Sequence, residues 1–228
     1  MKLLLFDLDG TLVTTGGAGV RALNRAFLKV VGISNAMDGI RPHGKTDPAI
    51  IREVFTLRSF GRPSDVLGQI IDAYVEFLPD EVRQSPNYRI LPGIPRFLEF
   101  VSSRPDVVLG LATGNIERGA RIKLERGNLN RYFAFGGFGS DSESRTELVR
   151  IAAEKAAMHA GQRLDCDDIF VIGDTPRDID AGRGCGFHTV GVATSDYSIA
   201  DLEASGADFV LADFEREADQ FLRMARIV

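Results

Sequence analysis

The sequence of 228 residues has no tryptophan, only three histidines and no long apolar run. A helix that crosses a bilayer needs about 20 consecutive apolar residues. The first apolar run offers only five such positions (3–6 and 8), which is too short for the apolar region of a secretion signal. We therefore expect no membrane span, no membrane partner and a cytoplasmic location.

Cysteine is also scarce, because Cys166 and Cys185 are the only two in the chain. A single pair in a chain of this size favours reduced thiols in a cytosol. Neither cysteine has histidine or cysteine neighbours at the spacing of a zinc site. We expect two ordinary thiols and no structural metal that depends on them.

An excess of positive charge is missing as well. The formal net charge is −5 and the isoelectric point is about 5.3. Such a balance does not favour a polyanionic partner, so we expect no nucleic-acid binding. With 44% hydrophobic and 26% charged residues, the composition is that of an ordinary globular protein. The length suffices for one large domain or for a core with a smaller lobe.

The most informative segment begins with an apolar run, residues 2–6, which ends in the motif DLDGT, residues 7–11. Such a run is typical of a strand that is buried on both faces. Asp7 and Asp9 stand two residues apart, so continued strand geometry would place both carboxylates on one face. They would repel one another unless a cation or a shared proton relieves them, and Mg²⁺ suits such oxygen ligands. A hairpin turn at Asp9-Gly10 is the alternative interpretation.

At these residues the chain resembles the haloacid dehalogenase superfamily, in particular its phosphatases of the phosphoglycolate phosphatase type. The resemblance implies that Asp7 is a nucleophile that forms an aspartyl-phosphate, and that Asp9 is the general acid and base. It also implies a Mg²⁺ site and a movable cap.

The region after the motif is expected to be helical. Apolar residues recur at helical spacing over 18–31, 48–57 and 63–78, and no convincing strand occurs between residues 14 and 85. We therefore predict an all-helical cap domain, 15–85, inserted into a catalytic core that comprises 1–14 and 86–228.

The remainder of the chain alternates strands with helices, which favours a parallel sheet covered on both faces. We predict an α/β fold with a Rossmann-like three-layer core. Ligands of such sheets bind beyond the carboxyl ends of the strands. The later strands are expected at 106–112, 132–135, 169–173, 189–192 and 209–211, with helices at 94–103, 116–126 and 143–160.

Polar residues follow two of these strands. Thr113 and the amides near Gly114 can hold phosphoryl oxygens, so we assign Thr113 to catalysis and Gly114 with Asn115 to substrate binding. Asp174 and Asp178 stand at a strand-to-helix junction, where Asp174 can bind Mg²⁺ directly while Asp178 supports it. The alternative for this acidic pair is a helix N-cap with a first-turn acid. We expect the metal at Asp7, Asp9, Asp174 and Asp178.

The third motif of the resembling family is usually a lysine, and here the chain departs from the pattern. Arg145 and Lys155 are the two candidates, separated by ~15 Å along a helix. Only the beginning of that helix adjoins the strand ends, so we favour Arg145 as a catalytic cation. An arginine can bind two phosphate oxygens at once.

The segment before residue 48 in the predicted cap is a polar loop that contains Lys45 and Thr46. In resembling phosphatases a loop at this point enters the active site, which implies substrate contacts by Lys45 and Thr46. The alternative is a solvated loop with Asp47 as a helix N-cap and Pro48 as the first helical residue. Arg118 and Arg121 are expected on a solvated helix face, and His159 and His188 are expected to be structural.

Together these features predict a Mg²⁺-dependent phosphomonoester hydrolase that acts on a small phosphorylated metabolite, as a monomer or homodimer. Phosphoglycolate, a sugar phosphate and a nucleotide monophosphate all remain possible substrates. A phosphosugar mutase is an alternative, and a dehalogenase is disfavoured because it does not need Asp9. A phosphate-accepting binding module is a further alternative, but it would leave Asp9 and the helical insert unexplained.

Overall fold

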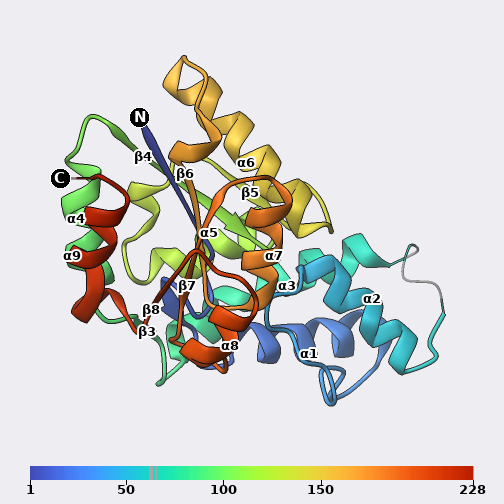
Figure 1. Cartoon of the computed structure of the whole chain (residues 1–228). Helices are drawn as coiled ribbons and strands as arrows, with labels where there is room; N and C mark the ends of the chain where they lie inside the picture. Colours follow the sequence, from blue (N-terminus) through green and yellow to red (C-terminus); the bar gives the residue numbers. More distant parts are fainter. Residues whose placement is uncertain (62–63, 65, 228) are drawn as a thin grey trace.

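The structure is a computed structural model that describes residues 1–61, 64 and 66–227. Its centre is a six-stranded sheet with the order β5-β4-β1-β6-β7-β8, in which every neighbouring pair is parallel. Figure 1 shows these strands in the middle of the molecule. The strands are β1 (Lys2–Phe6), β4 (Val107–Thr113), β5 (Gly136–Phe138), β6 (Ile169–Gly173), β7 (His188–Val192) and β8 (Phe209–Leu211).

Helices cover both faces of this sheet, so the core has three layers and is Rossmann-like, as predicted. Helices α4 and α9 lie on one face and helices α6 and α7 on the other (Figure 1). The helices that follow the strands are α4 (Ile94–Ser102), α5 (Glu117–Glu125), α6 (Arg145–Ala160), α7 (Pro176–Gly184), α8 (Ile199–Ala204) and α9 (Phe214–Met224), with the short 3₁₀ helices η2 (Asn130–Tyr132) and η3 (Cys166–Asp168).

Strand β1 is buried on both faces, which explains its unbroken apolar sequence. Leu3 and Leu5 pack with residues of α6 and α7, while Leu4 and Phe6 pack with residues of α4 and α9. All four side chains are fully buried. Burial of a side chain such as Phe6 stabilises the fold by roughly 1.5–3 kcal/mol. This packing holds β1 in the centre of the sheet, and Asp7 directly follows it.

Three further helices precede the second strand of the large sheet. They pack around a separate apolar core that contains Phe27, Phe55 and Tyr74. Figure 1 shows them gathered beside the sheet, on its lower right. These helices are α1 (Ala18–Val31), α2 (Asp47–Leu57) and α3 (Leu67–Gln84).

A two-stranded antiparallel ribbon joins this helical segment to the sheet. It consists of β2 (Val13–Thr14) and β3 (Arg89–Ile90), so the chain leaves the sheet region and returns to it at one place. The Ser85 hydroxyl donates to the carbonyl oxygen of Thr15 at 2.7 Å beside the ribbon. The predicted domain limits at 14/15 and 85/86 fall next to this ribbon.

Most predicted elements agree with the structure to within a few residues, and both cysteines are free thiols. The predicted start of the third helix at Pro63 lies outside the described residues. Among the described residues, no strand occurs between Thr14 and Arg89. Within that same part of the chain, none of the helices combines the length and apolar character that a bilayer crossing demands.

The strand predicted at 132–135 was placed incorrectly. Residue 132 belongs to η2, and the strand itself is β5, which begins at Gly136. A β-carbon on Gly137 would lie 1.8 Å from the Leu148 carbonyl oxygen of α6. Gly137 therefore lets the α6 backbone rest directly on the strand, whereas a β-carbon on Gly136 would lie 2.8 Å from Leu111 of β4. These glycines hide the strand from an apolar pattern.

We expect Gly137→Ala to reduce the free energy of unfolding by about 2 kcal/mol or more, because α6 or β5 must shift to admit the methyl group. Gly68→Ala is the matched control, since a β-carbon at Gly68 in α3 meets no atom within 4 Å. That control should be neutral or stabilising by up to about 1 kcal/mol. Urea unfolding of the two variants measures the difference, and equal stability would contradict the packing described.

Candidate active site

Three neighbouring strand ends bring the predicted residues together. Asp7 follows β1, Thr113 ends β4 and Asp174 follows β6, and β1 lies between the other two strands. The Asp7 amide donates to the carbonyl oxygen of Ile172 at 2.8 Å, so the chain continues in register as it leaves β1. Gly10 then turns with a φ of 88°. A β-carbon there would lie 2.3 Å from Asp174 Oδ2, so only glycine lets this turn approach the carboxylate.

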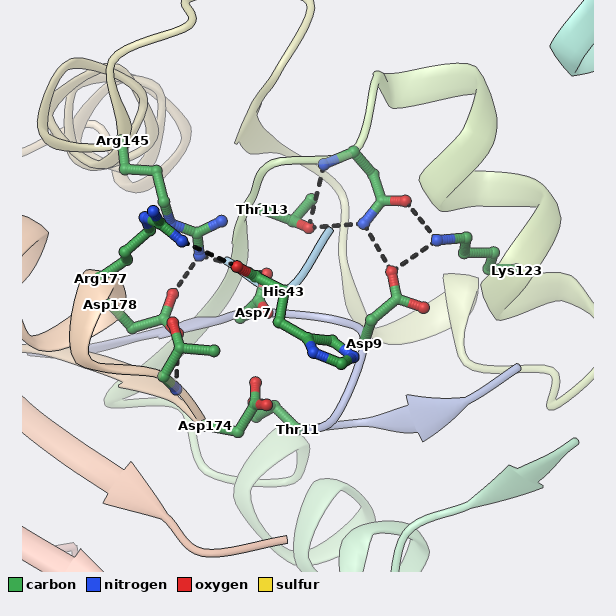
Figure 2. A network of polar contacts seen from close by, with 12 residues as sticks. Asp7, Asp9, Thr11, His43, Thr113, Lys123, Arg145, Asp174, Arg177 and Asp178 are labelled. Atoms are coloured by element: carbon green, nitrogen blue, oxygen red, sulfur yellow. Dashed lines mark hydrogen bonds and ion pairs between the residues drawn. The ribbon is translucent and has the colours of Figure 1, made fainter. Parts of the chain in front are cut away.

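Three carboxylates form a compact buried group at these strand ends. Asp7, Asp174 and Asp178 each offer an oxygen atom, and these atoms lie within 4.8 Å of one another. Figure 2 shows Arg145 approaching this group from one side. Its guanidinium forms ion pairs with Asp178 and with Asp7, the latter over 3.4 Å between Nη2 and Oδ1. We refer to these three carboxylates as the acid cluster.

Asp178 is fixed by a second set of contacts at the beginning of α7. Its Oδ2 accepts hydrogen bonds from the Thr175 amide at 3.0 Å and from the Thr175 hydroxyl at 2.7 Å. This is a capping box with Thr175 as the N-cap, so the predicted first-turn acid is confirmed for Asp178, while the metal role of the acidic pair stays a prediction. Asp178 caps the helix with one oxygen and pairs with Arg145 through the other.

Burial raises the pKa of two carboxyl groups of the cluster, Asp7 and Asp174. The pKa of Asp7 rises to about 6 because the carboxyl is desolvated, and Arg145 only partly opposes this shift. Burial, and then the charge of Asp7, raise the pKa of Asp174 well above its ordinary value. One guanidinium therefore does not offset three carboxylates. A hard divalent cation with oxygen ligands, such as Mg²⁺, fits this donor set and its surplus negative charge.

The Asp9 carboxylate is not part of the acid cluster, and its role as a fourth metal ligand stays a prediction. Its Oδ2 accepts hydrogen bonds from Lys123 Nζ at 2.5 Å and from Asn115 Nδ2 at 2.9 Å. The side chain is drawn to this cation on α5, on the side of the site opposite Arg145 (Figure 2). Asn115 also donates to Thr113 Oγ1 at 2.9 Å, so the amide ties two strand ends together.

Lys123 is the main site residue that sequence reasoning missed. It is only 5% exposed, and its ammonium also donates to Asn115 Oδ1 at 2.6 Å. The signal was present in the sequence. Ala120 and Leu124 form part of the buried stripe of α5, and Lys123 lies on that same stripe. A lysine there needs a buried partner, whereas a lysine on a solvated face needs none.

Asp47 connects the helical segment to the sheet. Its amide donates to the Gly114 carbonyl oxygen at 2.8 Å, and its Oδ2 accepts from the Ile116 amide at 2.9 Å. A β-carbon on Gly114 would lie 2.2 Å from the Lys45 carbonyl oxygen, so glycine permits this close approach. Burial raises the pKa of Asp47 to about 6, although the Lys123 ammonium opposes that rise.

The loop before α2 differs from the prediction in two respects. Thr46, not Asp47, is the N-cap of α2, and its Oγ1 accepts the Ala49 amide at 3.4 Å. The fully buried Thr46 side chain does not line the main cavity, because it is turned toward the helix it caps. Lys45 does line that cavity, but its ammonium is paired with Glu53 of the same helix.

The main cavity has a volume of about 430 Å³ and lies between the strand ends and the helical segment. Asp7, Asp9, Arg145 and Asp174 line its sheet side, together with the 113–115 segment. The helical segment contributes apolar and polar walls. The cavity lining from helices α1, α2 and α3 and the loop before α2 includes Gly19, Leu23, Met37, Asp47, Ile50 and Tyr74.

Comparison with known proteins places the chain in a family. A sequence model of haloacid dehalogenase-like hydrolases matches residues 4–192, which is most of the chain. The chain belongs to the haloacid dehalogenase-like hydrolase family. The match includes the strand ends described above, and the resemblance inferred from the DLDGT motif is thereby confirmed.

Relatives of this hydrolase include a phosphoglycolate phosphatase from Agrobacterium fabrum (strain C58). It is 27% identical over 214 residues, which cover 93% of this chain and 88% of that protein. A hydrolase from Pseudomonas syringae has the same fold, with a TM-score of 0.75, 21% identity and coverage of 98% and 99% of the two chains. CbbY from Rhodobacter sphaeroides, solved in complex with phosphate, gives a TM-score of 0.72 at 18% identity, with coverage of 95% and 96%.

The other cations named from the sequence lie away from the cavity of this hydrolase. Lys155 donates to the Gly136 carbonyl oxygen at 2.9 Å and pairs with Asp141 at 3.0 Å, so it supports the end of β5. Arg118 pairs with Asp72 in solvent. Arg145 is the candidate that contacts the acid cluster, because it begins α6 while Lys155 lies near the other end.

The raised pKa of Asp47 predicts a pH-dependent stability. The folded protein has a pKa of about 6 at this group, whereas an unfolded chain has about 3.9. The folded state therefore binds the proton more tightly, and the stabilisation present at low pH is lost as pH rises through about 4 to 6.

Asp47→Asn should remove this dependence while its side-chain oxygen still accepts the Ile116 amide. We compare the free energy of unfolding of the wild type minus that of the variant at two pH values. We expect this difference to be about 2 kcal/mol larger at pH 4.5 than at pH 7. Urea unfolding without added metal at both pH values measures this difference of differences. A value near zero, or of opposite sign, would contradict the assignment.

Proposed function

We propose that this protein is a Mg²⁺-dependent phosphomonoesterase that acts on a small phosphorylated metabolite through an aspartyl-phosphate. The observation that carries the proposal is the position of Asp7, which lies between Arg145, the cation paired with the acid cluster, and the separately held carboxylate of Asp9. The relationship to a phosphoglycolate phosphatase supports a phosphate ester as the substrate. Catalysis in the cytoplasm stays a prediction.

Asp7 is the proposed nucleophile. A carboxylate oxygen attacks phosphorus, the bond from phosphorus to the ester oxygen breaks, and an acyl phosphate forms. Arg145 contacts Asp7 directly and is held by Asp178, so it is positioned to offset charge on the phosphoryl oxygens. Mg²⁺, held by Asp7 and Asp174 with Asp178 beside them, would neutralise further phosphoryl charge.

Thr113 is proposed to donate to a phosphoryl oxygen. Its Oγ1 accepts hydrogen bonds from the Asn115 amide at 3.3 Å and from Asn115 Nδ2 at 2.9 Å. Because the oxygen already accepts these two hydrogen bonds, the hydroxyl hydrogen can donate to another acceptor. The Gly114 amide lies next to it at the same strand end and is a second donor for the phosphoryl group.

Asp9 is proposed as the general acid and base. Lys123 and Asn115 both hold its Oδ2, which leaves Oδ1 to exchange a proton with substrate and water. In the first step Asp9 gives its proton to the departing alkoxide. In the second step it takes a proton from the water that attacks the acyl phosphate. The hydrogen bonds from Lys123 and Asn115 fix the carboxylate, so Oδ1 faces the same side of the site in both steps.

Residues 15–85 are proposed to act as a movable cap. Part of their contact with the sheet region consists of exposed ion pairs, such as Arg52 with Glu143 and Asp72 with Arg118. Exposed pairs of this kind contribute roughly 0–1 kcal/mol each, so they permit opening for substrate entry. Closure over the cavity would exclude water from the phosphoryl group.

The two aspartates of the motif should give different pre-steady-state behaviour with p-nitrophenyl phosphate and Mg²⁺. Nitrophenolate leaves without protonation, so Asp9→Asn should release a rapid burst of about one equivalent of nitrophenolate per chain. Later turnover should be slow, because hydrolysis of the acyl phosphate lacks its general base. Asp7→Asn should give no burst and no turnover.

The burst is measured by stopped-flow absorbance against enzyme concentration. Asp72→Asn is the matched control, because this aspartate is exposed and pairs only with Arg118 among the described residues. It should retain wild-type turnover. Turnover by Asp7→Asn that matches wild type would contradict the proposed function.

Mg²⁺ should also stabilise the folded protein independently of turnover. Binding at 100 times the Kd raises the free energy of unfolding by about 2.7 kcal/mol, and the relief of repulsion in the acid cluster is its physical source. Asp174→Asn should lose most of this gain, and Asp72→Asn should keep it. Thermal unfolding with and without Mg²⁺ measures the effect, and an equal shift in both variants would count against the site.

A further inference from the structure

The wall of the cavity that faces away from the acid cluster carries polar groups that the proposed chemistry does not use. Tyr74 of α3 is 1% exposed and lines the cavity, yet its hydroxyl has no hydrogen-bond partner among the described residues. A β-carbon on Gly19 would lie 3.6 Å from this hydroxyl and 3.6 Å from Lys123 Nζ. Gly19 therefore leaves space beside both groups, and the Tyr74 hydroxyl, which no protein group bonds among the described residues, can bond a ligand in the cavity.

Asp47 belongs to the same wall. Only its Oδ2 has a partner among the described residues, the Ile116 amide, and the residue lines the cavity. Burial is the main cause that raises the pKa of Tyr74 well above its ordinary value, and the charges of Asp47 and Asp9 raise it further. The phenol therefore stays protonated and can donate. We refer to Asp47, Tyr74 and Lys123 as the distal polar wall.

The charge of this wall decides which ligand it accepts. Asp9 and Asp47 carry two carboxylates, and Lys123 is the one buried cation beside them among the described residues. Both Asp9 and Asn115 already accept from that ammonium. A second anionic group on the substrate would face two carboxylates and no unpaired buried cation, so its desolvation would not be compensated.

The other cations around the cavity do not change this balance. Lys45 is paired with Glu53, and Arg145 with Asp7 and Asp178. Arg89 is exposed on β3, where solvent screens its charge. Hydroxyl groups of a substrate, by contrast, can donate to Asp47 and accept from Tyr74, and Leu23, Met37 and Ile50 supply an apolar surface for its carbon chain.

We propose that the leaving group is an uncharged polyol or sugar, held by the distal polar wall, and not a carboxylate-bearing alcohol such as glycolate. The inference rests on the proposed phosphomonoesterase function and names the substrate class for that site. Asp47 and Tyr74 bind hydroxyl groups of the substrate. The enzyme is accordingly selective for polyol and sugar phosphates over phosphoglycolate, the substrate named for its relative from Agrobacterium fabrum.

The test compares kcat/KM of the full chain with Mg²⁺ for glycerol 3-phosphate, ribose 5-phosphate, glucose 6-phosphate, phosphoglycolate and p-nitrophenyl phosphate. We expect the best of the three polyol and sugar phosphates to exceed phosphoglycolate at least tenfold. Hydrolysis of p-nitrophenyl phosphate that depends on Asp7, together with a preference for phosphoglycolate, would overturn this inference and leave the proposed function intact. Hydrolysis of none of the five would overturn both.

Two variants test the wall itself. Tyr74→Phe should lower the ratio of kcat/KM for the best polyol phosphate to that for p-nitrophenyl phosphate by about tenfold, the loss of one good hydrogen bond. Tyr132→Phe is the matched control, because its hydroxyl bonds Glu99 and Arg131 at the surface. That control should leave the ratio unchanged, and an equal change in both variants would overturn the assignment of Tyr74.

Asp47→Asn should act in opposite directions on the two substrate classes. Removal of the negative charge should lower kcat/KM for the best polyol phosphate and raise it severalfold for phosphoglycolate. Circular dichroism and urea unfolding verify that each variant is folded. A parallel loss for both substrates would show that Asp47 only supports the structure, and would overturn its role in selectivity.

Discussion

The surplus of negative charge around Asp7 is the constraint on which the rest of the site depends. Asp7, Asp174 and Asp178 share one buried space with a single guanidinium, and burial raises the pKa of Asp7 to about 6. Parallel strands with apolar sequences hold these carboxylates in place despite their repulsion. A fold with less burial around β1 would let the carboxylates separate, and the surplus of buried charge that fits a divalent cation would then disappear.

The two cations of the site, Arg145 and Lys123, bind different aspartates of the DLDGT motif. Arg145 is bound to the acid cluster, where phosphoryl charge would be offset. Lys123 holds Asp9 away from that cluster through Oδ2, and the proposed proton transfer would use the other carboxylate oxygen. Two aspartates two residues apart thus acquire different surroundings, and different surroundings are what permit different chemical roles.

Asp47 and Gly114 join the helical segment to the strand ends. The amide and carboxylate of Asp47 both bond the segment that follows β4, and the lack of a side chain at Gly114 permits that approach. The same carboxylate lines the cavity beside Tyr74. A residue that docks the helical segment therefore also lines the cavity where the proposed leaving group would lie, so the proposed closure and recognition would depend on one side chain.

The sequence by itself determined the sheet, the helical segment and the positions of Asp7, Thr113 and Asp174, because apolar strands and the polar residues that follow them are local patterns. It misplaced β5, whose glycines are explained by close contacts with α6 and β4. The partners of Asp9, the partners of Lys123 and the docking of Asp47 were decided by tertiary structure alone. Each joins residues far apart in the chain, and only packing of α5 and α2 against the strand ends brings their charges within bonding distance.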